Sequence, residues 1–486
     1  MSRKLFLRIA ILLLLCLAVQ VKADKTIYLL ADPHVMGPSL LDSSDNIAWQ
    51  KDLAEQRKMQ DLSAAVFDLL IERVITDHPE ALLICGDLTK DGEKVSHKYV
   101  IEKLTKVKNA GIPVYIIPGN HDHGEMEEAR KYANNTYTPA EGGLTEAQFR
   151  TTYKDFGYGG DCEIYEGSLC YAVELFPGLT LIGIDTGTNT HVRSKAIKWV
   201  CEKALEAKGK GNQVIAMAHH SLLPHFYDQE SFMAYSMIDN HEIVRDSLLH
   251  AGVKVVFTGH YHISDNTRYI DSEGNEIYDI CTGSPISYPC DFRKLVFDDE
   301  FKQLKILTES VTSLHGFDDF PSYAKSRLMD AFNRWAYNWF EEHNVSSMVS
   351  EALAPTIADA FIIHAEGDEP GNSGTEEILL LYEDILAMAP VIEGESEGRI
   401  TKVCLTIKSM LGDYPSEDEV DNVVNDREFT ISMTGEPLGI PEPVEGSQEL
   451  RQAQSPYWYT LQGQRLNGKP VAPGVYIRNG KKIISH

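Results

Sequence analysis

The chain has 486 residues, and its 45 Lys and Arg against 72 Asp and Glu give a formal net charge of −27. At roughly 100–200 residues per domain, this length predicts two or three domains. A hydrophobic share of 43% excludes a chain that is disordered, collagen-like or coiled-coil throughout. The acidity argues against a protein that binds a nucleic-acid polymer or docks on an anionic membrane, because both need clustered Lys and Arg.

The first 23 residues have the pattern of an export signal. Arg3, Lys4 and Arg8 form a basic start, residues 9–19 are apolar, and residues 21–23 fit a small-residue cleavage site. The apolar run is short for a bilayer span, so we expect cleavage and export rather than anchoring. No later stretch reaches about 18 apolar residues, so we expect no transmembrane segment in the mature chain.

Residues 24–314 alternate short apolar runs with amphipathic helical patterns. The apolar runs cover residues 26–31, 81–85, 114–117, 171–175, 179–184, 214–218 and 253–257. Helical patterns between them include residues 59–76, 95–109 and 195–207. Alternation of this kind is typical of buried strands and covering helices in an α/β layered fold, so we predict one α/β domain over 24–314.

The remaining chain divides into three further segments. Residues 315–425 carry helical stripes only, such as Leu328, Phe332, Trp335 and Trp339, which we interpret as a helical core rather than a ligand site. Residues 426–450 are rich in Pro, Glu and Gly and predict a linker, and residues 451–486 predict a small β tail.

The charge supports this division. Residues 351–445 hold 22 acidic and 4 basic side chains, whereas residues 451–486 hold six basic and no acidic ones. Such an asymmetry is typical of separate modules.

The spacing of the cysteines suggests two possible disulfides. Cys162 with Cys170 and Cys281 with Cys290 are close enough in sequence to form disulfides in an oxidising compartment. Cys85 lies inside an apolar run and is expected to be a buried thiol. No Cys-x-x-Cys pair occurs, so the sequence does not predict a thiolate zinc site.

Side chains able to bind metals follow five of the apolar runs. They are found in Asp32-Pro33-His34, Gly86-Asp87, Gly119-Asn120-His121-Asp122, His219-His220 and Gly259-His260-Tyr261-His262. The carboxyl ends of strands are where α/β sheets bind ligands, and imidazole with carboxylate oxygen suits Mn, Fe, Zn and Co. About seven ligand positions exceed one tetrahedral zinc site but suit two metals that share a bridge.

This ordered set resembles the calcineurin-like metallophosphoesterase superfamily, from residue 25 to about 310. The resemblance implies a four-layer α/β/β/α sandwich with two divalent or mixed-valence transition metals, of which Mn, Fe and Zn are the first candidates. The implied ligands of one metal are Asp32, His34, Asp87 and His262. The implied ligands of the other are Asp87, as the bridge, with Asn120, His219 and His260.

Two positions near these ligands leave alternatives open. The family often has His-His-Pro with its first His as ligand, but Ser221 stands here in place of Pro, so His220 competes with His219. His121 is the implied catalytic residue, which donates a proton to the leaving group or orients the phosphate. Asp122 either orients His121 or caps the following turn.

Residues 86–93 narrow the resemblance. Lys90 stands where purple acid phosphatases have a Tyr ligand, so we do not expect their charge-transfer site. The stretch is more similar to the cyclic-nucleotide-phosphodiesterase-like branch. Some bacterial members of that branch carry a helical C-terminal domain, and residues 315–425 could be its counterpart.

The resulting functional hypothesis is an exported dinuclear-metal phosphodiesterase that hydrolyses small phosphodiesters, cyclic nucleotides among them, by attack of a metal-bound hydroxide. Two divalent ions would add about four positive charges at the site, so a small anionic substrate is compatible with the acidic chain. One alternative is a phosphomonoesterase or nucleotidase with the same metals. The other is a surface binding protein with a vestigial site.

Two segments outside the metal motifs carry open alternatives. The aromatic loop from His225 to Tyr235 either stacks on a base or aryl leaving group or packs on the adjacent domain. The tail 451–486 is similar to the sorting tails of proteins exported by the type IX route, which implies outer-membrane export machinery as a partner and a cell-surface or extracellular location instead of the periplasm. The alternative is a plain β hairpin.

Overall fold

The computed structural model describes residues 24–435, except 125–128, 188–189, 228, 234, 343–344, 346, 368, 370–371, 394–397 and 413–424. It also describes four short strands within residues 458–485. The predicted export signal at residues 1–23 therefore lies outside the described residues, as does most of the predicted linker.

A six-stranded sheet contains the first three predicted strands. Its order is β15-β14-β13-β1-β2-β3, in which β1, β2 and β3 are parallel and the other pairs are antiparallel. The strands are β1 (Lys25–Leu30), β2 (Ala81–Cys85), β3 (Val114–Ile117), β13 (Asp291–Phe297), β14 (Gln303–Ser310) and β15 (Glu428–Ser432).

A seven-stranded sheet contains the later predicted strands. Its order is β11-β12-β10-β9-β8-β7-β6, with β8, β9, β10 and β12 parallel. The strands are β6 (Glu163–Ile164), β7 (Tyr171–Phe176), β8 (Leu179–Gly183), β9 (Gln213–Met217), β10 (Val255–Thr258), β11 (Asp265–Ile270) and β12 (Glu276–Cys281).

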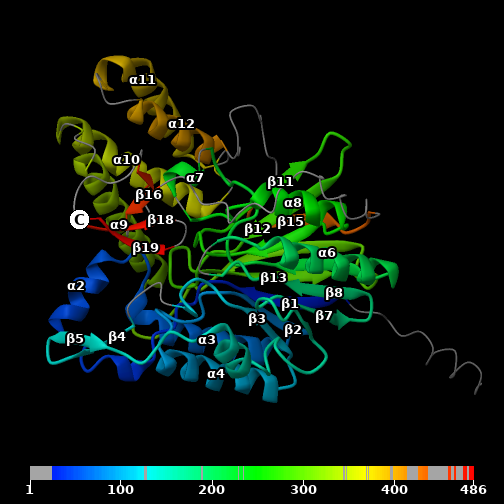
Figure 1. Ribbon diagram of the computed structural model, residues 1–486. Coiled ribbons are helices and arrows are strands. Elements are labelled where there is room, and N and C mark those ends of the chain that lie inside the picture. Colours follow the sequence, from blue (N-terminus) through cyan, green and yellow to red (C-terminus); the bar gives the residue numbers. More distant parts are fainter. Residues whose placement is uncertain are drawn as a thin grey trace, which may run out of the picture.

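The two sheets pack face to face between two layers of helices, so the predicted four-layer sandwich is confirmed (Figure 1). Residues of β9 show how the layers are built. Ile215 and Met217 join the hydrophobic cluster that contains β1 and β2, whereas Val214 and Ala216 join the cluster under the outer helices. Successive side chains of a strand point to opposite faces, so an all-apolar strand can serve two cores.

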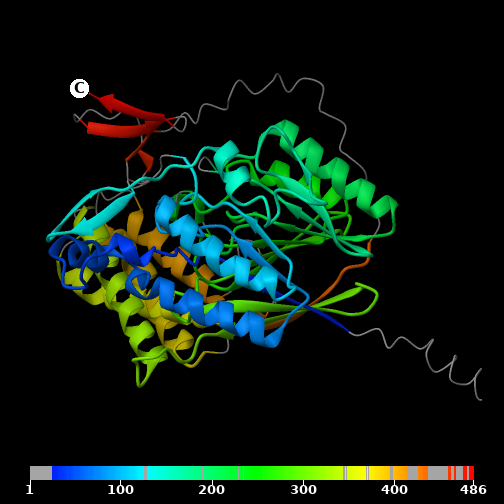
Figure 2. The same cartoon turned by 90° about the horizontal axis from the view of Figure 1, so that it is seen from below.

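The outer helices are amphipathic. α3 (Ser63–Asp77) and α4 (Lys94–Asn109) cover the six-stranded sheet, and Figure 2 shows them in front when the molecule is seen from below. α6 (Ser194–Gly209) and α8 (His241–His250) cover the other sheet. α6 buries Ile197, Val200 and Ala204, which recur every three to four residues, and each large apolar side chain contributes about 1.5–3 kcal/mol.

Several small elements interrupt the alternation of strands and long helices. They are the 3-10 helices η1 (Pro38–Leu40) and η2 (Gln60–Leu62), the helices α2 (Ile47–Glu55), α5 (Glu146–Thr152) and α7 (Gln229–Phe232), and the hairpin β4 (Arg130–Ala133) with β5 (Thr136–Pro139). Buried Trp49 of α2 packs on Tyr132 of the hairpin, with ring centroids 5.1 Å apart. This contact joins a segment that lies between the first and second metal motifs to one that follows the third.

The helical region lies beside the two sheets in both views (Figures 1 and 2). It consists of α9 (Phe320–Glu342), α10 (Ser347–Glu366), α11 (Thr375–Glu393) and α12 (Arg399–Gly412). Phe332 of the predicted stripe is buried and stacks on Phe361, with ring centroids 4.1 Å apart. Phe226 and Tyr261 of the sandwich belong to the same hydrophobic cluster. In the aromatic loop, Phe226 therefore packs on the adjacent domain, as the second alternative predicted.

The structure differs from the prediction at the beginning of the linker. Residues 428–432, within the predicted linker 426–450, form β15 and pair with β14. The composition of the segment as a whole obscured a short alternating pattern in which Ile431 is buried in the sandwich core. Further on, the tail contains β16 (Trp458–Thr460), β17 (Arg465–Leu466), β18 (Gly474–Arg478) and β19 (Lys481–Ser485), in the order β17-β16-β18-β19.

All seven cysteines in the described residues are free. Cys85 is buried in β2, as expected. The two suggested disulfides are absent. The Cys170 sulfur accepts a hydrogen bond from the backbone N–H of Asp185, and the Cys281 thiol donates to the carbonyl of Gly259. None of the helices in the described part of the chain combines the length and apolar character that a membrane span needs.

Candidate metal centre

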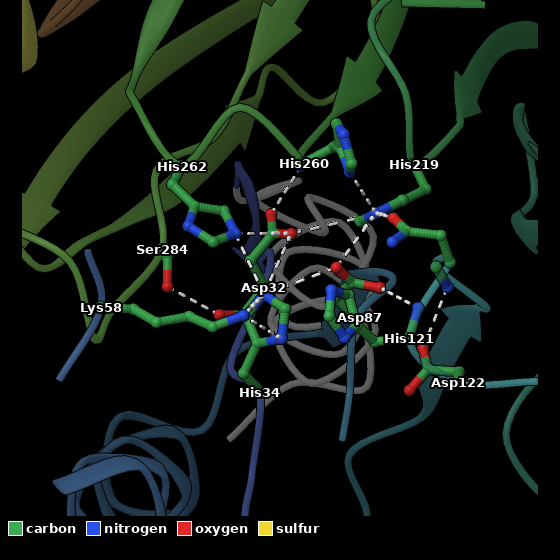
Figure 3. Close-up of polar contacts among 12 residues, drawn as sticks. Asp32, His34, Lys58, Asp87, His121, Asp122, His219, His260, His262 and Ser284 are labelled. Atoms are coloured by element: carbon green, nitrogen blue, oxygen red, sulfur yellow. Dashed lines mark hydrogen bonds and ion pairs between the residues drawn. The ribbon is translucent and has the colours of Figure 1, made fainter. Parts of the chain in front are cut away.

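The five predicted motifs meet at one place because their strands run in parallel within two facing sheets. Asp32 follows β1, Asp87 follows β2 and Asn120 follows β3, all in the six-stranded sheet. His219 follows β9 and His260 follows β10 in the other sheet. Figure 3 shows Asp32, Asp87, His219 and His260 around a common centre.

Five of the predicted ligands have a left-handed backbone. Their φ angles are 51° at Asp32, 40° at His34, 48° at Asp87, 66° at His260 and 65° at His262. A non-glycine residue in this region costs on the order of 1–3 kcal/mol, and such strain concentrates at functional sites. The chain therefore places these side chains at some cost to the free energy of folding.

Glycines before the ligands let the loops approach one another. A Cβ on Gly119 would lie 2.1 Å from Oδ1 of Asp87, and a Cβ on Gly259 would lie 2.5 Å from Oδ2 of Asp32. Both distances are far below van der Waals contact. Only glycine at these two positions permits the observed arrangement of the carboxylates.

One group of potential ligands joins Asp32, His34, Asp87 and His262, whose donor atoms lie within 4.8 Å of one another. Nε2 of His34 is 3.0 Å from Nε2 of His262 and 3.4 Å from Oδ2 of Asp87. Nε2 of His262 is 3.4 Å from Oδ1 of Asp32. The structure thus brings together the four residues that were predicted to hold one metal.

The residues predicted for the other metal lie around His219. Nε2 of His219 is 3.0 Å from Oδ1 of Asn120, 3.1 Å from Nδ1 of His260 and 3.3 Å from Oδ2 of Asp87. The same oxygen of Asp87 therefore lies near both groups. That position suits a bridging carboxylate.

The geometry favours His219 over His220 as the ligand. Nδ1 of His219 lies 2.8 Å from the carbonyl oxygen of Cys85, which can only accept a hydrogen bond, so Nδ1 carries a proton and Nε2 faces the centre. Nδ1 of His220 instead contacts the hydroxyl of Thr186 at 2.8 Å. His220 still lies within reach of the group, together with His219 and His260.

The residues present fit bound cations. Oδ1 of Asp32 is buried without a hydrogen-bond partner. Burial, and then the charge of Lys58, hold the pKa of His34 well below its usual range, and burial also lowers the pKa of His262. Two neutral imidazoles with nitrogens 3.0 Å apart, beside carboxylate oxygens, form a donor set that a metal ion would complete.

Asp87 is ionised in this environment. Burial acts to raise its pKa, but the neighbouring His219, His121 and His34 outweigh burial and hold the pKa well below its usual range. The same pairing raises the pKa of His219 to about 9, against the opposing effect of burial. A carboxylate that is anionic while buried is well suited to hold cations.

His121 lies beside the centre rather than within either group. Its Nδ1 is 3.2 Å from Oδ1 of Asp91, and its ring meets that of His34 edge-on at 4.8 Å. Its backbone N–H donates to Oδ1 of Asp87 at 2.8 Å. Burial lowers the pKa of His121, but Asp87 and Asp91 outweigh it and leave the pKa raised.

Asp91, not Asp122, contacts the His121 ring. Asp122 accepts hydrogen bonds from the backbone N–H groups of Leu88, Thr89 and Gly119 at 2.9–3.0 Å. Asp122 therefore ties the loop after β2 to the loop after β3, which is neither of the two roles considered for it. Asp91 was not singled out from the sequence, although it lies in the stretch 86–93 that pointed to the site.

Lys58 is a site residue that sequence reasoning missed. Its Nζ lies 3.0 Å from Nδ1 and 3.2 Å from Nε2 of His34, and burial lowers the pKa of this amine to about 8. Figure 3 shows it entering from the side opposite His121. Lys58 stands between α2 and η2 outside any motif, so only the tertiary structure reveals its position.

In a comparison with known protein families, residues 25–264 match the model of the calcineurin-like phosphoesterases. Among solved structures, a dimetal phosphatase from Danio rerio is 14% identical, with 59% of this chain and 96% of that chain covered and a TM-score of 0.40. A purple acid phosphatase from yellow lupin is 13% identical, with 62% and 53% covered and a TM-score of 0.40. A sulfate thiohydrolase from Thermus thermophilus is 9% identical, with 64% and 61% covered and a TM-score of 0.32. Among curated proteins, none matches the sequence.

Proposed function

Residues 25–264 of this chain belong to the calcineurin-like phosphoesterase family, which makes the protein a metal-dependent hydrolase, and we propose that it is a dinuclear phosphodiesterase acting on small phosphodiesters. Cyclic nucleotides are one candidate substrate. The observation that carries the proposal is Oδ2 of Asp87, which is 3.4 Å from Nε2 of His34 and 3.3 Å from Nε2 of His219. One carboxylate oxygen thereby serves both groups of potential ligands.

The proposed division of ligands follows the two groups. Asp32, His34 and His262 would hold one ion, and Asn120, His219 and His260 would hold the other. Asp87 would belong to both. Two ions at such a site offset the negative charge of a phosphoester and supply Lewis acidity for its hydrolysis.

The chain's own residues supply the proton and the orientation. Because Asp91 contacts Nδ1 of His121, Nε2 of that ring is the atom available to give a proton to the leaving oxygen. The backbone N–H of His121 donates to Oδ1 of Asp87, so the ring and the proposed bridge are positioned by the same loop. Lys58 places an amine at the opposite side, where it can bind a phosphate oxygen.

A phosphomonoesterase or nucleotidase is the second candidate. Lys58 is the observation in its favour, because one additional cation suits the second negative charge of a monoester. The relative turnover of a monoester and a diester by one preparation decides between the two candidates.

The test is the replacement Asp87→Ala. We expect it to lower hydrolysis of bis(p-nitrophenyl) phosphate at least 1000-fold, on the order of 4 kcal/mol in transition-state stabilisation, because both groups of ligands lose a member. Protein reconstituted with Mn, Fe or Zn is assayed on this diester and on p-nitrophenyl phosphate. Asp45→Ala, which alters an exposed carboxylate away from the site, is the matched control and should leave both rates unchanged.

Two results would count against the proposal. Full activity of Asp87→Ala would remove the proposed mechanism. Wild-type protein with nothing near two metal equivalents and no turnover of either ester would instead favour a binding protein with a vestigial site.

Export is part of the proposal and is supported by the sequence at both ends of the chain. The basic and apolar pattern of residues 1–23 supports secretion, and the tail 451–486 supports recognition by outer-membrane export machinery. Fractionation of cells that produce the full chain, and chains lacking residues 451–486, checks this. Retention of the full-length protein in the cytoplasm would contradict export, and an unchanged location without the tail would contradict sorting.

A further inference from the structure

A separate group of buried polar residues lies where the sandwich meets the helical region. Asp265 begins β11, His364 is in the last turn of α10, and Glu369 follows that helix. Each is about 1% exposed, and one donor atom from each lies within 4.8 Å of the other two. None of them belongs to the proposed catalytic centre.

His364 presents an unpartnered nitrogen to this group. Nδ1 of His364 contacts Oε1 of Glu369, so the proton of the neutral ring belongs on Nδ1. Nε2 then carries a lone pair and no proton. This nitrogen is buried without a hydrogen-bond partner and lies 3.5 Å from Oδ2 of Asp265. Burial lowers the pKa of His364 to about 4, so the ring is neutral near pH 7. Two electron-rich atoms that face each other in the interior are a destabilising arrangement unless a cation lies between them.

The other oxygen of Asp265 is already engaged. Oδ1 of Asp265 is 2.8 Å from Nδ1 of His225. The other ring nitrogen of His225, Nε2, is 3.6 Å from Oδ2 of Asp279. Burial opposes the charging of His225, but these two carboxylates outweigh it and raise its pKa to about 10. His225 therefore orients Asp265 and leaves Oδ2 directed at His364.

A further buried carboxyl group lies beside this group of residues. Asp426, which precedes β15, is also buried, and its pKa is held well above the usual range by burial and by the charges of Asp265 and Glu369. Its Oδ1 accepts a hydrogen bond from the backbone N–H of Asn266 at 2.6 Å. The carboxyl groups of Asp265 and Glu369 are therefore close enough to Asp426 to oppose its ionisation, and two carboxyl groups beside an imidazole favour a divalent cation over a neutral ligand.

We propose that Asp265, His364 and Glu369 bind a third, structural divalent metal ion that joins the helical region to the sandwich. One imidazole nitrogen and two carboxylates suit a borderline ion such as Zn²⁺ or Mn²⁺. The proposal does not depend on which phosphoester the catalytic centre hydrolyses.

The position of this site gives the ion a structural consequence. Asp265 is three residues after His262, and the ring of Tyr261, between the two predicted histidine ligands, lies 5.6 Å from that of His364 and 6.3 Å from that of His225. An ion held by Asp265 and by two residues of the helical region would therefore fix the loop that carries His260 and His262.

Metal content and anomalous diffraction test the proposal on the full-length protein. After reconstitution with Zn²⁺ and removal of free metal, we expect three equivalents in the wild type, two in His364→Ala, and at least one remaining in Asp87→Ala. His315→Ala, which alters an exposed histidine before α9, is the control and should keep three. In zinc-loaded wild-type crystals, an anomalous peak is expected between Oδ2 of Asp265 and Nε2 of His364.

The outcomes separate this site from the catalytic one. Two equivalents in the wild type, with anomalous peaks only among the predicted catalytic ligands, would overturn the third site and leave the proposed function intact. Zinc at the interface with no turnover would do the reverse. Should His364→Ala fail to fold, the wild-type peak alone decides.

Discussion

Gly119 and Gly259 influence the centre through the side chains that they lack. Their α-carbons lie so close to the carboxylates of Asp87 and Asp32 that a methyl group would overlap an oxygen, at 2.1 and 2.5 Å respectively. Neither glycine has a positive φ, so the constraint is one of space rather than of backbone conformation. Such positions can be tested without touching any ligand.

We therefore predict that Gly259→Ala displaces Asp32 and lowers both metal content and activity. A loss of at least 10-fold in kcat/KM is expected, about 1.4 kcal/mol or more, because an ångström-scale shift of a ligand disturbs the whole centre. The measurement is metal analysis together with the diester assay. Gly209→Ala is the control, since nothing lies within 4 Å of its added Cβ. Equal metal content in Gly259→Ala and wild type would show that the loop adjusts.

At the scale of elements, α4 is held against α5 by a buried histidine. His97 of α4 contacts the hydroxyl of Tyr153 through Nδ1 at 2.8 Å, and its ring packs edge-on against Phe149. Burial lowers the pKa of His97 to about 4, below the value of about 6.5 expected in the unfolded chain. The neutral form of this side chain is therefore the one that the fold stabilises.

The sign of the resulting pH dependence follows from proton binding. Between pH 6.5 and pH 4 the unfolded chain binds a proton at this position that the folded protein does not. The stabilisation is thus present above about pH 6.5 and is lost as the pH falls toward 4. From pH 7 to pH 5, His97 should account for a loss of about 2 kcal/mol in the free energy of unfolding.

The variant His97→Gln checks this prediction. Urea unfolding at pH 7 and pH 5 should show a smaller loss on acidification in the variant than in the wild type, because Gln does not titrate. His315→Gln, at an exposed position, should behave like the wild type. An identical pH dependence in all three proteins would show that His97 titrates normally in the fold.

At the scale of the whole molecule, the chain returns to the sandwich after the helical region. β15 pairs with β14 and buries Ile431 and Met433 in or beside the sandwich core. Arg293, which is buried in β13, donates a hydrogen bond to the backbone oxygen of Asp426, just before β15. The sandwich is thus completed by residues that follow the helices in sequence.

We predict that a chain ending at residue 435 keeps the stability of the sandwich, whereas one ending at residue 425 does not. The shorter chain leaves the edge of β14 unpaired and exposes the cavity that Ile431 fills, which costs roughly 2–5 kcal/mol. Thermal unfolding and diester hydrolysis of the two truncated chains measure the difference. Equal melting temperatures would show that β15 contributes nothing to the sandwich.

Most of the layered architecture could be predicted from the sequence because local periodicity reflects burial. Seven apolar runs became strands, and the stripe through Phe332 became helical core. β15 escaped detection because a five-residue edge strand carries too little periodicity to stand out against the acidic, Pro- and Gly-rich segment around it.

The side chains at the strand ends, and their order along the chain, can be read from the amino-acid sequence alone because each motif is local. That these residues bind metals remains a prediction that the measurements above address. The choice of His219 over His220, the partnership of His121 with Asp91, and the approach of Lys58 depend on where separate loops meet. The same is true of Asp265, which lies beside His364 although 99 positions separate them in the chain. Only the tertiary structure decides such contacts, because packing brings together side chains whose spacing along the chain carries no signal.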